Sequence, residues 1–199
     1  MLISITSSAL CKDGFLKRIE LIAASGADRI ILREKQLDEK EYLCLAEKCL
    51  DICRKYDTAF SVNSFVSAAR VLGADLHLPL FMLENEPSLA GEFPVLGVSV
   101  HSPEEAERAC GLGAGYIIAG HIFETDCKKG LPPRGTDYLS KVVRSANIPV
   151  YAVGGIKAQN CHEVCSAGAK GICVMSELMT CPADEIKTRI KALKEAFGR

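Results

Sequence analysis

The sequence contains no Trp and few aromatic residues, which make up 6% of its 199 positions. It has no apolar run close to the roughly 18 residues that a membrane-spanning helix needs. Residues 1–10 lack the basic residue that begins a secretion signal. Charge of one sign is also not in excess, because 24 Lys and Arg stand against 25 Asp and Glu. These absences exclude a membrane partner and a nucleic-acid partner, and we expect a cytoplasmic globular protein.

Ten cysteines are present, but none belongs to a Cys-x-x-Cys pair. Cys49 and Cys53, like Cys161 and Cys165, are spaced i, i+4 in segments with helical periodicity. Neither pair has a second pair at the spacing that zinc requires. We therefore expect reduced thiols that act as small apolar side chains, and neither a disulfide framework nor a metal site.

Short apolar runs rich in β-branched residues alternate with segments whose apolar residues recur every three or four positions. The runs are 2–6, 29–32, 59–62, 75–78, 95–100, 116–119, 150–153 and 171–174. Continuous apolar strands that alternate with helices indicate a parallel sheet buried on both faces. Eight such units predict one α/β domain over residues 1–199, folded as a (β/α)8 TIM barrel. A doubly wound open sheet is the alternative, because a sequence does not show whether a sheet closes.

The loops after the last two runs have the composition of a phosphate site. Gly154 and Gly155 follow the seventh run, and Met175 and Ser176 follow the eighth. Glycines let backbone N–H groups approach an anion, and a short helix from Ser176 adds free amides. We predict that the amides of Gly155, Met175 and Ser176 hold a phosphate, whereas a simple tight turn is the alternative. Gly155→Val is expected to crowd that phosphate while leaving the fold largely intact.

Polar side chains also follow other strands. Arg33 and Lys35 follow the second run and are two positions apart, so in an extended chain their side chains point to the same side. Both can therefore face the barrel mouth and hold an anion. A solvated rim is the alternative for these charges. Asn63 and Ser99 lie at the ends of the third and fifth runs. They are candidates for orienting a ligand, although each could instead cap a helix, a role that Ser102 fits better.

The longest loop follows the sixth run and covers residues 120–135. Loops of this length in a compact barrel usually bind a ligand or close over it. His121, near its start, is either a proton carrier or a structural hydrogen-bonding group. Cys127 beside Lys128 is a second candidate, because neighbouring cations favour a thiolate. We interpret His77, at the end of a strand, and His162, on a helix face, as ordinary structural residues.

The order of these residues resembles the thiamine phosphate synthase superfamily over essentially the whole chain. The resemblance rests on residues 32–35, 63, 99–101, 120–128, 153–156 and 174–176. Within that superfamily, residues 120–131, Gly-His-Ile-Phe-Glu-Thr-Asp-Cys-Lys-Lys-Gly-Leu, resemble the TenI branch, the thiazole tautomerases of thiamine biosynthesis.

The chain departs from the synthase pattern where that pattern binds Mg²⁺. The synthases have an Asn-Asp pair after the third strand and an Asp soon after the fourth. Here Ser64 follows Asn63, and residues 78–83 contain no carboxylate. Ile31 also replaces a Gln of the synthase pattern, and His121 replaces a Pro. Because Mg²⁺ requires oxygen ligands, the resemblance implies that the groups for pyrophosphate transfer are missing.

The resemblance implies an isomerase that uses no cofactor and no metal. Its small-molecule substrate would be a carboxylated thiazole phosphate with an exocyclic double bond, and its product the aromatic isomer. The implied catalytic residue is His121. The implied substrate-binding residues are Arg33, Lys35, Asn63, Ser99, Lys128, Gly130, Gly155, Met175 and Ser176. Residual synthase activity and a non-catalytic regulatory role are the alternatives, and the sequence leaves open whether the chain forms a homo-oligomer.

Overall fold

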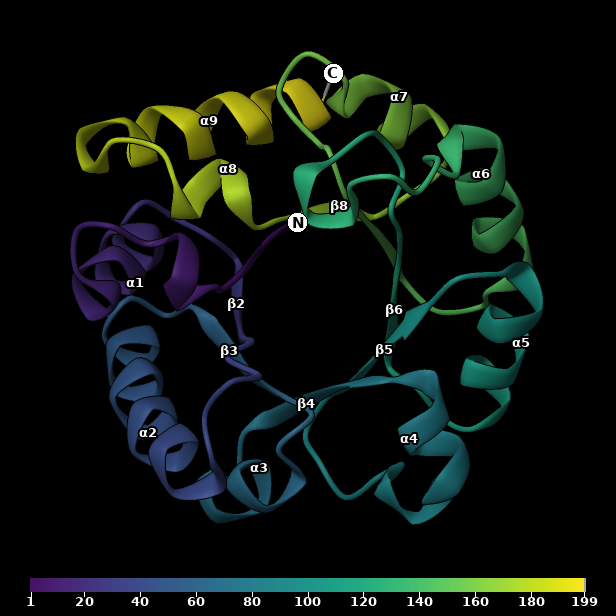
Figure 1. The fold of residues 1–199 in the computed structure, drawn as a ribbon. Helices are drawn as coiled ribbons and strands as arrows, with labels where there is room; N and C mark the ends of the chain where they lie inside the picture. Colours follow the sequence, from purple (N-terminus) through teal and green to yellow (C-terminus); the bar gives the residue numbers. More distant parts are fainter. Residues whose placement is uncertain (199) are drawn as a thin grey trace.

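The computed structural model describes residues 1–198, which form a closed barrel of eight parallel strands surrounded by helices (Figure 1). The strands pair in chain order, and β8 (Gly171–Val174) closes the barrel against β1 (Leu2–Ile5). The other strands are β2 (Arg29–Leu32), β3 (Ala59–Asn63), β4 (Asp75–Pro79), β5 (Leu96–Val100), β6 (Tyr116–Gly120) and β7 (Val150–Val153). The predicted (β/α)8 barrel is confirmed. Residue 199, the last of the predicted domain, lies outside the described residues.

Helices follow the strands and cover the outside of the barrel. They are α1 (Phe15–Ala24), α2 (Glu39–Lys55), α3 (Val66–Leu72), α4 (Leu80–Asn85), α5 (Pro103–Gly111), α6 (Gly135–Ser145), α7 (Cys161–Ser166), α8 (Ser176–Met179) and α9 (Ile186–Phe197). Short 3₁₀ turns are η1 (Ser8–Leu10), η2 (Pro87–Leu89), η3 (Asp126–Lys128) and η4 (Ala183–Glu185). None of the described helices is long and apolar enough to cross a membrane.

Local sequence signals explain where these helices begin. Asp38 caps α2 in a reciprocal capping box, in which its carboxylate accepts from the amide of Glu41 at 2.8 Å. Ser102 caps α5 in the predicted manner, because its hydroxyl accepts from the amide of Glu105 at 3.1 Å. These caps fix where each helix leaves the strand before it, and therefore the shape of the loops at the barrel mouth.

The main apolar core lies between the strands and the helices. Strand side chains alternate between the two faces of the sheet, and the outward ones, such as Leu32, Leu76 and Val98, are fully buried against the helices. Cys49 and Cys53 of α2 belong to this core, as expected for small apolar thiols, whereas Cys165 of the other spaced pair is only partly buried. All ten cysteines are unpaired thiols.

The barrel interior is more polar than the sequence predicts. A small apolar cluster includes Ile3, Ile31 and Tyr116, but Arg29 and Asp75, which lie in runs predicted to be apolar, form an ion pair inside the barrel. Arg29 also donates to the hydroxyl of Ser61 at 2.6 Å. The expectation of uniformly apolar strands is therefore wrong for the inward face, because a charge can enter a barrel when its partner enters on another strand.

Candidate active site

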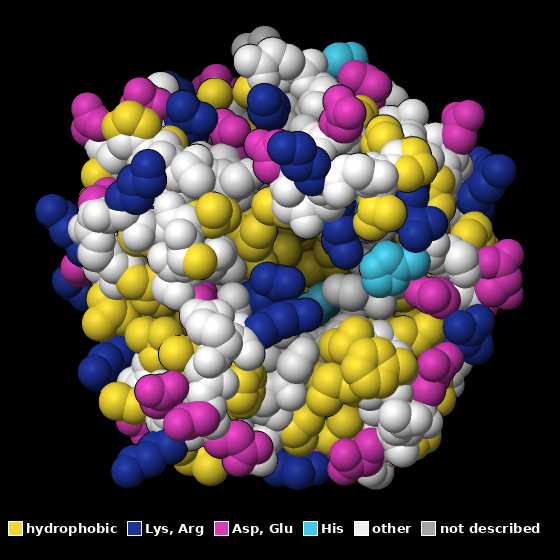
Figure 2. All heavy atoms as spheres, in the orientation of Figure 1, with side chains coloured by type: hydrophobic (Ala, Val, Ile, Leu, Met, Phe, Trp, Pro, Cys, Tyr) yellow, Lys and Arg dark blue, Asp and Glu magenta, His cyan; other side chains and the backbone are white. Residues whose placement is uncertain are grey.

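The carboxyl ends of the strands meet at the face shown in Figure 2. Lys and Arg side chains gather near the centre of this face, beside a histidine and around a hollow. This is the end of a (β/α)8 barrel at which catalytic residues are found. The predicted site residues come from the strand ends and the loops that form this face.

The carboxylate of Glu34 organises the loops after β1 and β2. Glu34 is 1% exposed. It accepts hydrogen bonds from the Thr6 hydroxyl at 2.6 Å, from the Ser8 hydroxyl at 2.6 Å and from the Ser8 amide at 2.9 Å. The amide group of Gln36 adds a further donor at 3.0 Å. This role of Glu34 was not predicted, although the alternation that turns Arg33 and Lys35 one way requires Glu34 to point the other way.

Three cations lie near one another at the mouth. The charge of Arg33, partial burial and the charge of Lys128 together lower the pKa of Lys35 below its ordinary value. Arg33, Lys35 and Lys128 form no ion pair with a carboxylate anywhere in residues 1–198. A group of cations that repel one another without acidic partners favours a bound anion. The structure thus brings these three predicted residues together.

Asn63 ends β3 and is 8% exposed. Its backbone amide donates to the hydroxyl of Tyr42 at 3.0 Å, and its side-chain amide donates to the hydroxyl of Ser64 at 2.9 Å. Ser64 has a φ of +67°, a left-handed conformation that is uncommon for residues other than Gly. Asn63 therefore lies at the mouth as predicted, with its side chain tied to the turn that follows the strand.

Ser99 lies on β5 and is hydrogen-bonded to His77, for which only an ordinary structural role was predicted. The Ser99 hydroxyl is 2.8 Å from His77 Nε2, and His77 Nδ1 is 3.2 Å from the hydroxyl of Tyr116. His77 is 4% exposed, and burial, assisted by the charge of Arg29, lowers the pKa of His77 to about 3. The imidazole is therefore neutral at physiological pH. The position of His77, two residues after the inward-facing Asp75, is the signal that could have placed it inside the barrel.

His121 follows the last residue of β6 and is half-buried. Its Nε2 atom lies 3.3 Å from the carbonyl oxygen of Leu131. Its Cβ packs against Gly154, where an added Cβ would lie only 2.4 Å away and where φ is +101°. A glycine at 154 is thus required both by the backbone conformation and by the close approach of His121.

The loop after β6 folds back onto its own start. The amides of Arg134 and Gly135 donate at 3.0 Å to the carbonyls of His121 and Ile122, respectively. Lys128 and Gly130 lie within this loop, and Cys127 is exposed in η3. The end of the loop therefore holds the backbone at its start, at His121 and Ile122, by hydrogen bonds.

Gly155 lies in the loop after β7 and packs on the β6 loop. An added Cβ would lie 2.3 Å from the carbonyl oxygen of Glu124 and 2.8 Å from Phe123, and φ at Gly155 is +66°. The expectation that Gly155→Val leaves the fold largely intact is therefore wrong, because the new side chain would collide with backbone before it met a ligand. The carbonyl of Gly155 accepts from the side chain of Asn160 at 3.0 Å, which further fixes this turn.

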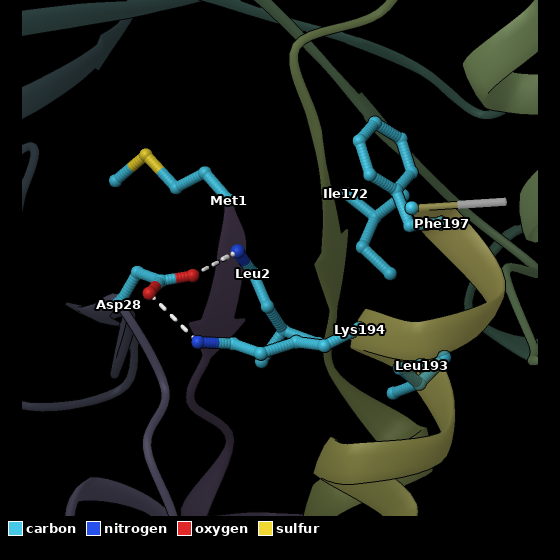
Figure 3. Close-up of a pocket in the computed structure, with 8 residues that line it drawn as sticks. Met1, Leu2, Asp28, Ile172, Leu193, Lys194 and Phe197 are labelled. Carbon is cyan, nitrogen blue, oxygen red and sulfur yellow. Dashed lines mark hydrogen bonds and ion pairs between the residues drawn. The ribbon is translucent and has the colours of Figure 1, made fainter.

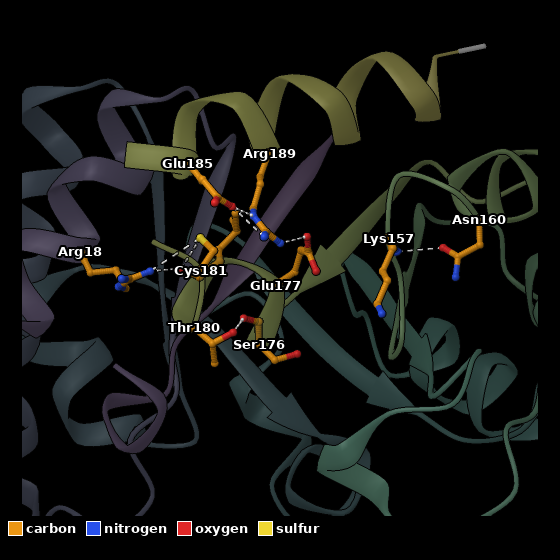
Figure 4. Close-up of polar contacts among 10 residues, drawn as sticks. Arg18, Lys157, Asn160, Ser176, Glu177, Thr180, Cys181, Glu185 and Arg189 are labelled. Atoms are coloured by element: carbon orange, nitrogen blue, oxygen red, sulfur yellow. Dashed lines mark hydrogen bonds and ion pairs between the residues drawn. The ribbon is translucent and has the colours of Figure 1, made fainter. Parts of the chain in front are cut away.

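The loop after β8 contains Met175 and leads into α8, which begins at Ser176. Figure 4 shows Ser176 with Thr180, whose hydroxyl donates to the Ser176 carbonyl at 2.8 Å. The same view shows Lys157 and Asn160 in the loop after β7. The backbone amides of Gly155 and Ser176 donate to no acceptor within residues 1–198. The structure therefore leaves these predicted phosphate donors free for a ligand.

The residues after β3 and β4 do not fit a magnesium site. The described residues contain no cluster of three or more His, Cys, Asp or Glu side chains able to hold a metal ion. Ser64 stands after Asn63, and the residues between Leu78 and Leu83 are apolar. The acids on either side of this segment are engaged elsewhere, since Asp75 of β4 pairs with Arg29, and Glu84 of α4 accepts from Arg108 at 2.8 Å.

A separate cavity of about 580 Å³ lies at the amino ends of the strands (Figure 3). It is lined in part by Met1, Ile172 and Phe197, and Asp28 forms an ion pair with Lys194 at 2.7 Å at its edge. Because this face is opposite to the strand ends that carry His121 and the cations, the cavity is separate from the candidate active site.

The fold and the sequence both match one enzyme family. The family model for thiamine monophosphate synthase matches residues 2–178. The thiamine-phosphate synthase of Pelotomaculum thermopropionicum is 35% identical over 188 residues, covering 91% of this chain and 85% of that protein. The corresponding protein of Halalkalibacterium halodurans is 34% identical over 191 residues, covering 94% and 90%. The solved structure of a thiamine phosphate pyrophosphorylase from Pyrococcus furiosus has a TM-score of 0.83 and 29% identity, covering 99% of this chain and 95% of that chain. The chain therefore belongs to the thiamine monophosphate synthase family of thiamine-biosynthesis enzymes.

Proposed function

We propose that this protein is a thiazole tautomerase, which aromatises a carboxylated thiazole phosphate by moving a proton from the ring to an exocyclic carbon. The observation that carries the proposal is the place of His121. It is a titratable side chain at the mouth, and it packs directly against Gly154 at the start of the predicted phosphate loop. The proposed proton carrier would therefore lie beside the proposed phosphate anchor.

The charges of the site suit a substrate with two anionic groups. Free amides at Gly155 and Ser176 lie on the β7 and β8 side of the mouth and would hold the phosphate. Arg33, Lys35 and Lys128 form the group of cations described above and would attract the carboxylate. Two separate anchors fix the orientation of the ring between them, which brings its reacting carbons to a defined place.

The contact between the His121 ring and the Leu131 carbonyl indicates which of the two ring nitrogens would act as the general base. A carbonyl oxygen only accepts hydrogen bonds, so in this contact His121 carries its hydrogen on Nε2. In the neutral ring Nδ1 then has the free lone pair. Nδ1 would take the proton from the ring carbon beside the carboxylate, and the imidazolium would return a proton to the exocyclic carbon. One side chain therefore serves both steps, and aromatisation drives the reaction.

Thiamine phosphate synthesis is the second candidate, and the names of the relatives favour it. That reaction joins two phosphorylated halves with loss of pyrophosphate, for which the resemblance implies Mg²⁺ held by carboxylates. The residues after β3 and β4 of this chain do not supply them, as shown above. Because these residues lack the carboxylates that would hold Mg²⁺, we place tautomerisation first.

Two assays on the purified protein distinguish the candidates. We expect conversion of the carboxythiazole phosphate tautomer to its aromatic isomer, at a rate that exhaustive EDTA treatment leaves unchanged. Coupling of the aromatic thiazole phosphate to the pyrimidine pyrophosphate, dependent on added Mg²⁺ and in the absence of tautomerase activity, would instead establish a synthase.

A third assay tests a non-catalytic role. A thermal-shift titration with the aromatic thiazole phosphate is expected to raise the melting temperature by mass action, as for any ligand that binds the folded state. Absence of both turnover and stabilisation would favour a regulatory protein on an enzyme scaffold.

A further inference from the structure

Two sets of hydrogen-bonded side chains lie in the barrel interior. In the first, Arg29 donates to the Ser61 hydroxyl at 2.6 Å. The second is a line that runs towards the mouth, from the hydroxyl of Tyr116 to His77 Nδ1 at 3.2 Å and from His77 Nε2 to the Ser99 hydroxyl at 2.8 Å. These groups come from five different strands and are all buried except Ser99, which is half-buried near the end of β5.

The chemistry of its members gives this line one direction. Burial raises the pKa of Tyr116, so its hydroxyl is a neutral phenol with one hydrogen to donate.

The direction continues through the imidazole. The nearest acceptor for the Tyr116 hydrogen is His77 Nδ1. A neutral imidazole that accepts at Nδ1 carries its hydrogen on Nε2, which then donates to Ser99. Ser99 makes no other side-chain hydrogen bond within residues 1–198, so its own hydrogen remains available at the mouth.

We infer that His77 is a positioning residue that fixes Ser99 as a hydrogen-bond donor to an acceptor atom of the bound anionic heterocycle. The reverse arrangement would leave Ser99 donating into the barrel and presenting only lone pairs to an anionic ligand, which would repel them. The ligand class rests on the proposed function, whereas the direction of the line rests on the barrel interior alone.

The direction can be tested without any activity. In protein labelled with ¹⁵N-histidine, long-range ¹H–¹⁵N correlation spectra report which ring nitrogen carries hydrogen. The signals of His77 are assigned by their loss in His77→Gln. We expect the Nε2–H form, and we expect Tyr116→Phe, which deletes only the donor to Nδ1, to populate the other tautomer as well. A wild-type His77 with hydrogen on Nδ1 would overturn the inference.

A double-mutant cycle then tests whether His77 acts through Ser99. Ser99→Ala and His77→Leu are each expected to raise KM about tenfold, the equivalent of one lost hydrogen bond, with kcat changed less. In the Ser99→Ala background, His77→Leu should raise KM no further, although it should still lower the melting temperature. His77→Gln, whose amide can donate to Ser99, should recover most of the affinity and serves if His77→Leu does not fold.

An equal rise in KM in both backgrounds would show that His77 does not act through Ser99 and would overturn the inference. If the wild-type protein has no tautomerase activity, the proposed function fails, and the tautomer measured by NMR alone decides the direction of the line.

Discussion

His121 and Gly154 are in direct contact across two neighbouring strands, such that a Cβ on Gly154 would lie 2.4 Å from the Cβ of His121 and 2.8 Å from its Cα. Strand pairing holds this contact, because the amide of Ile122 donates to the Val153 carbonyl at 2.9 Å and that of Phe123 to the Gly154 carbonyl at 3.0 Å. The proposed proton carrier is therefore placed by the backbone that also begins the predicted phosphate loop.

Gly154→Ala tests this contact. The new methyl group must push His121 away, so we expect kcat to fall at least tenfold and the free energy of unfolding to fall by roughly 1–3 kcal/mol. Gly26→Ala is the matched control, because Gly26 also has a positive φ, +90°, but has nothing within 4 Å of an added Cβ. It should lose stability without losing kcat. Similar kcat values for the two folded variants would contradict the contact's role.

His121→Asn tests the proton carrier. General acid–base catalysis is worth about 10² to 10⁴-fold, so we expect kcat to fall by that factor while KM changes little, since the phosphate anchor is intact. Steady-state kinetics of the folded variant provide the measurement. Cys127→Ser, made in parallel, should retain activity. A collapse of kcat in Cys127→Ser, with near-wild-type turnover in His121→Asn, would transfer the role to the thiol.

Glu34→Gln tests the buried carboxylate that joins the first two loops. The amide group of a Gln would face donors from Thr6 and Ser8, so we expect the free energy of unfolding to fall by about 1–3 kcal/mol. KM should also rise, because Arg33 and Lys35 flank this residue. Urea unfolding gives the stability, and Glu47→Gln, at an exposed position of α2, should change it by less than about 0.5 kcal/mol.

His77 predicts a loss of stability in mild acid. Burial, assisted by the charge of Arg29, lowers its pKa to about 3 in the folded protein, against about 6.5 in the unfolded chain. Between these values the unfolded state binds a proton that the folded state does not, so stability falls as the pH falls below about 6.5. The contribution of His77 is about 1 kcal/mol between pH 7 and pH 5.5.

Urea unfolding at these two pH values, for the wild type and for His77→Gln, isolates this contribution, because Gln does not titrate. A wild-type protein whose stability changes no more than that of His77→Gln would show that His77 takes up protons equally in both states.

The sequence predicts the strands of this barrel well, because short β-branched runs bounded by glycines allow few other structures. The predicted run 29–32 matches β2 and the run 171–174 matches β8. The interior was not predictable in the same way. Arg29 and Asp75 are 46 positions apart, and only the closed sheet shows that both point inward and neutralise one another.

The residues of the candidate site show the same difference between what could and what could not be predicted from the sequence. His121, Arg33 and Lys35 could be placed at the mouth because each follows a strand. The link from His77 to Ser99 and the four donors around Glu34 depend on which strands become neighbours, which alternation alone does not give. The failed expectation for Gly155 has the same origin, since its collision is with Glu124 of the neighbouring loop.

The pairing of β1 with β8 has a consequence for how the chain reaches this structure. The amino group of Met1 donates to the carbonyl of Lys170, 169 positions away. Parallel contacts of such sequence separation form late, because the entropy of closing a long loop opposes them until the intervening units are in place. A chain emerging from the ribosome therefore exposes two unpaired sheet edges, one on β1 and one on the most recently folded strand, until β8 has been made. During that interval other β-strands can bind to these edges, so the pairing of β8 with β1 is also the step that removes the last sites for such binding.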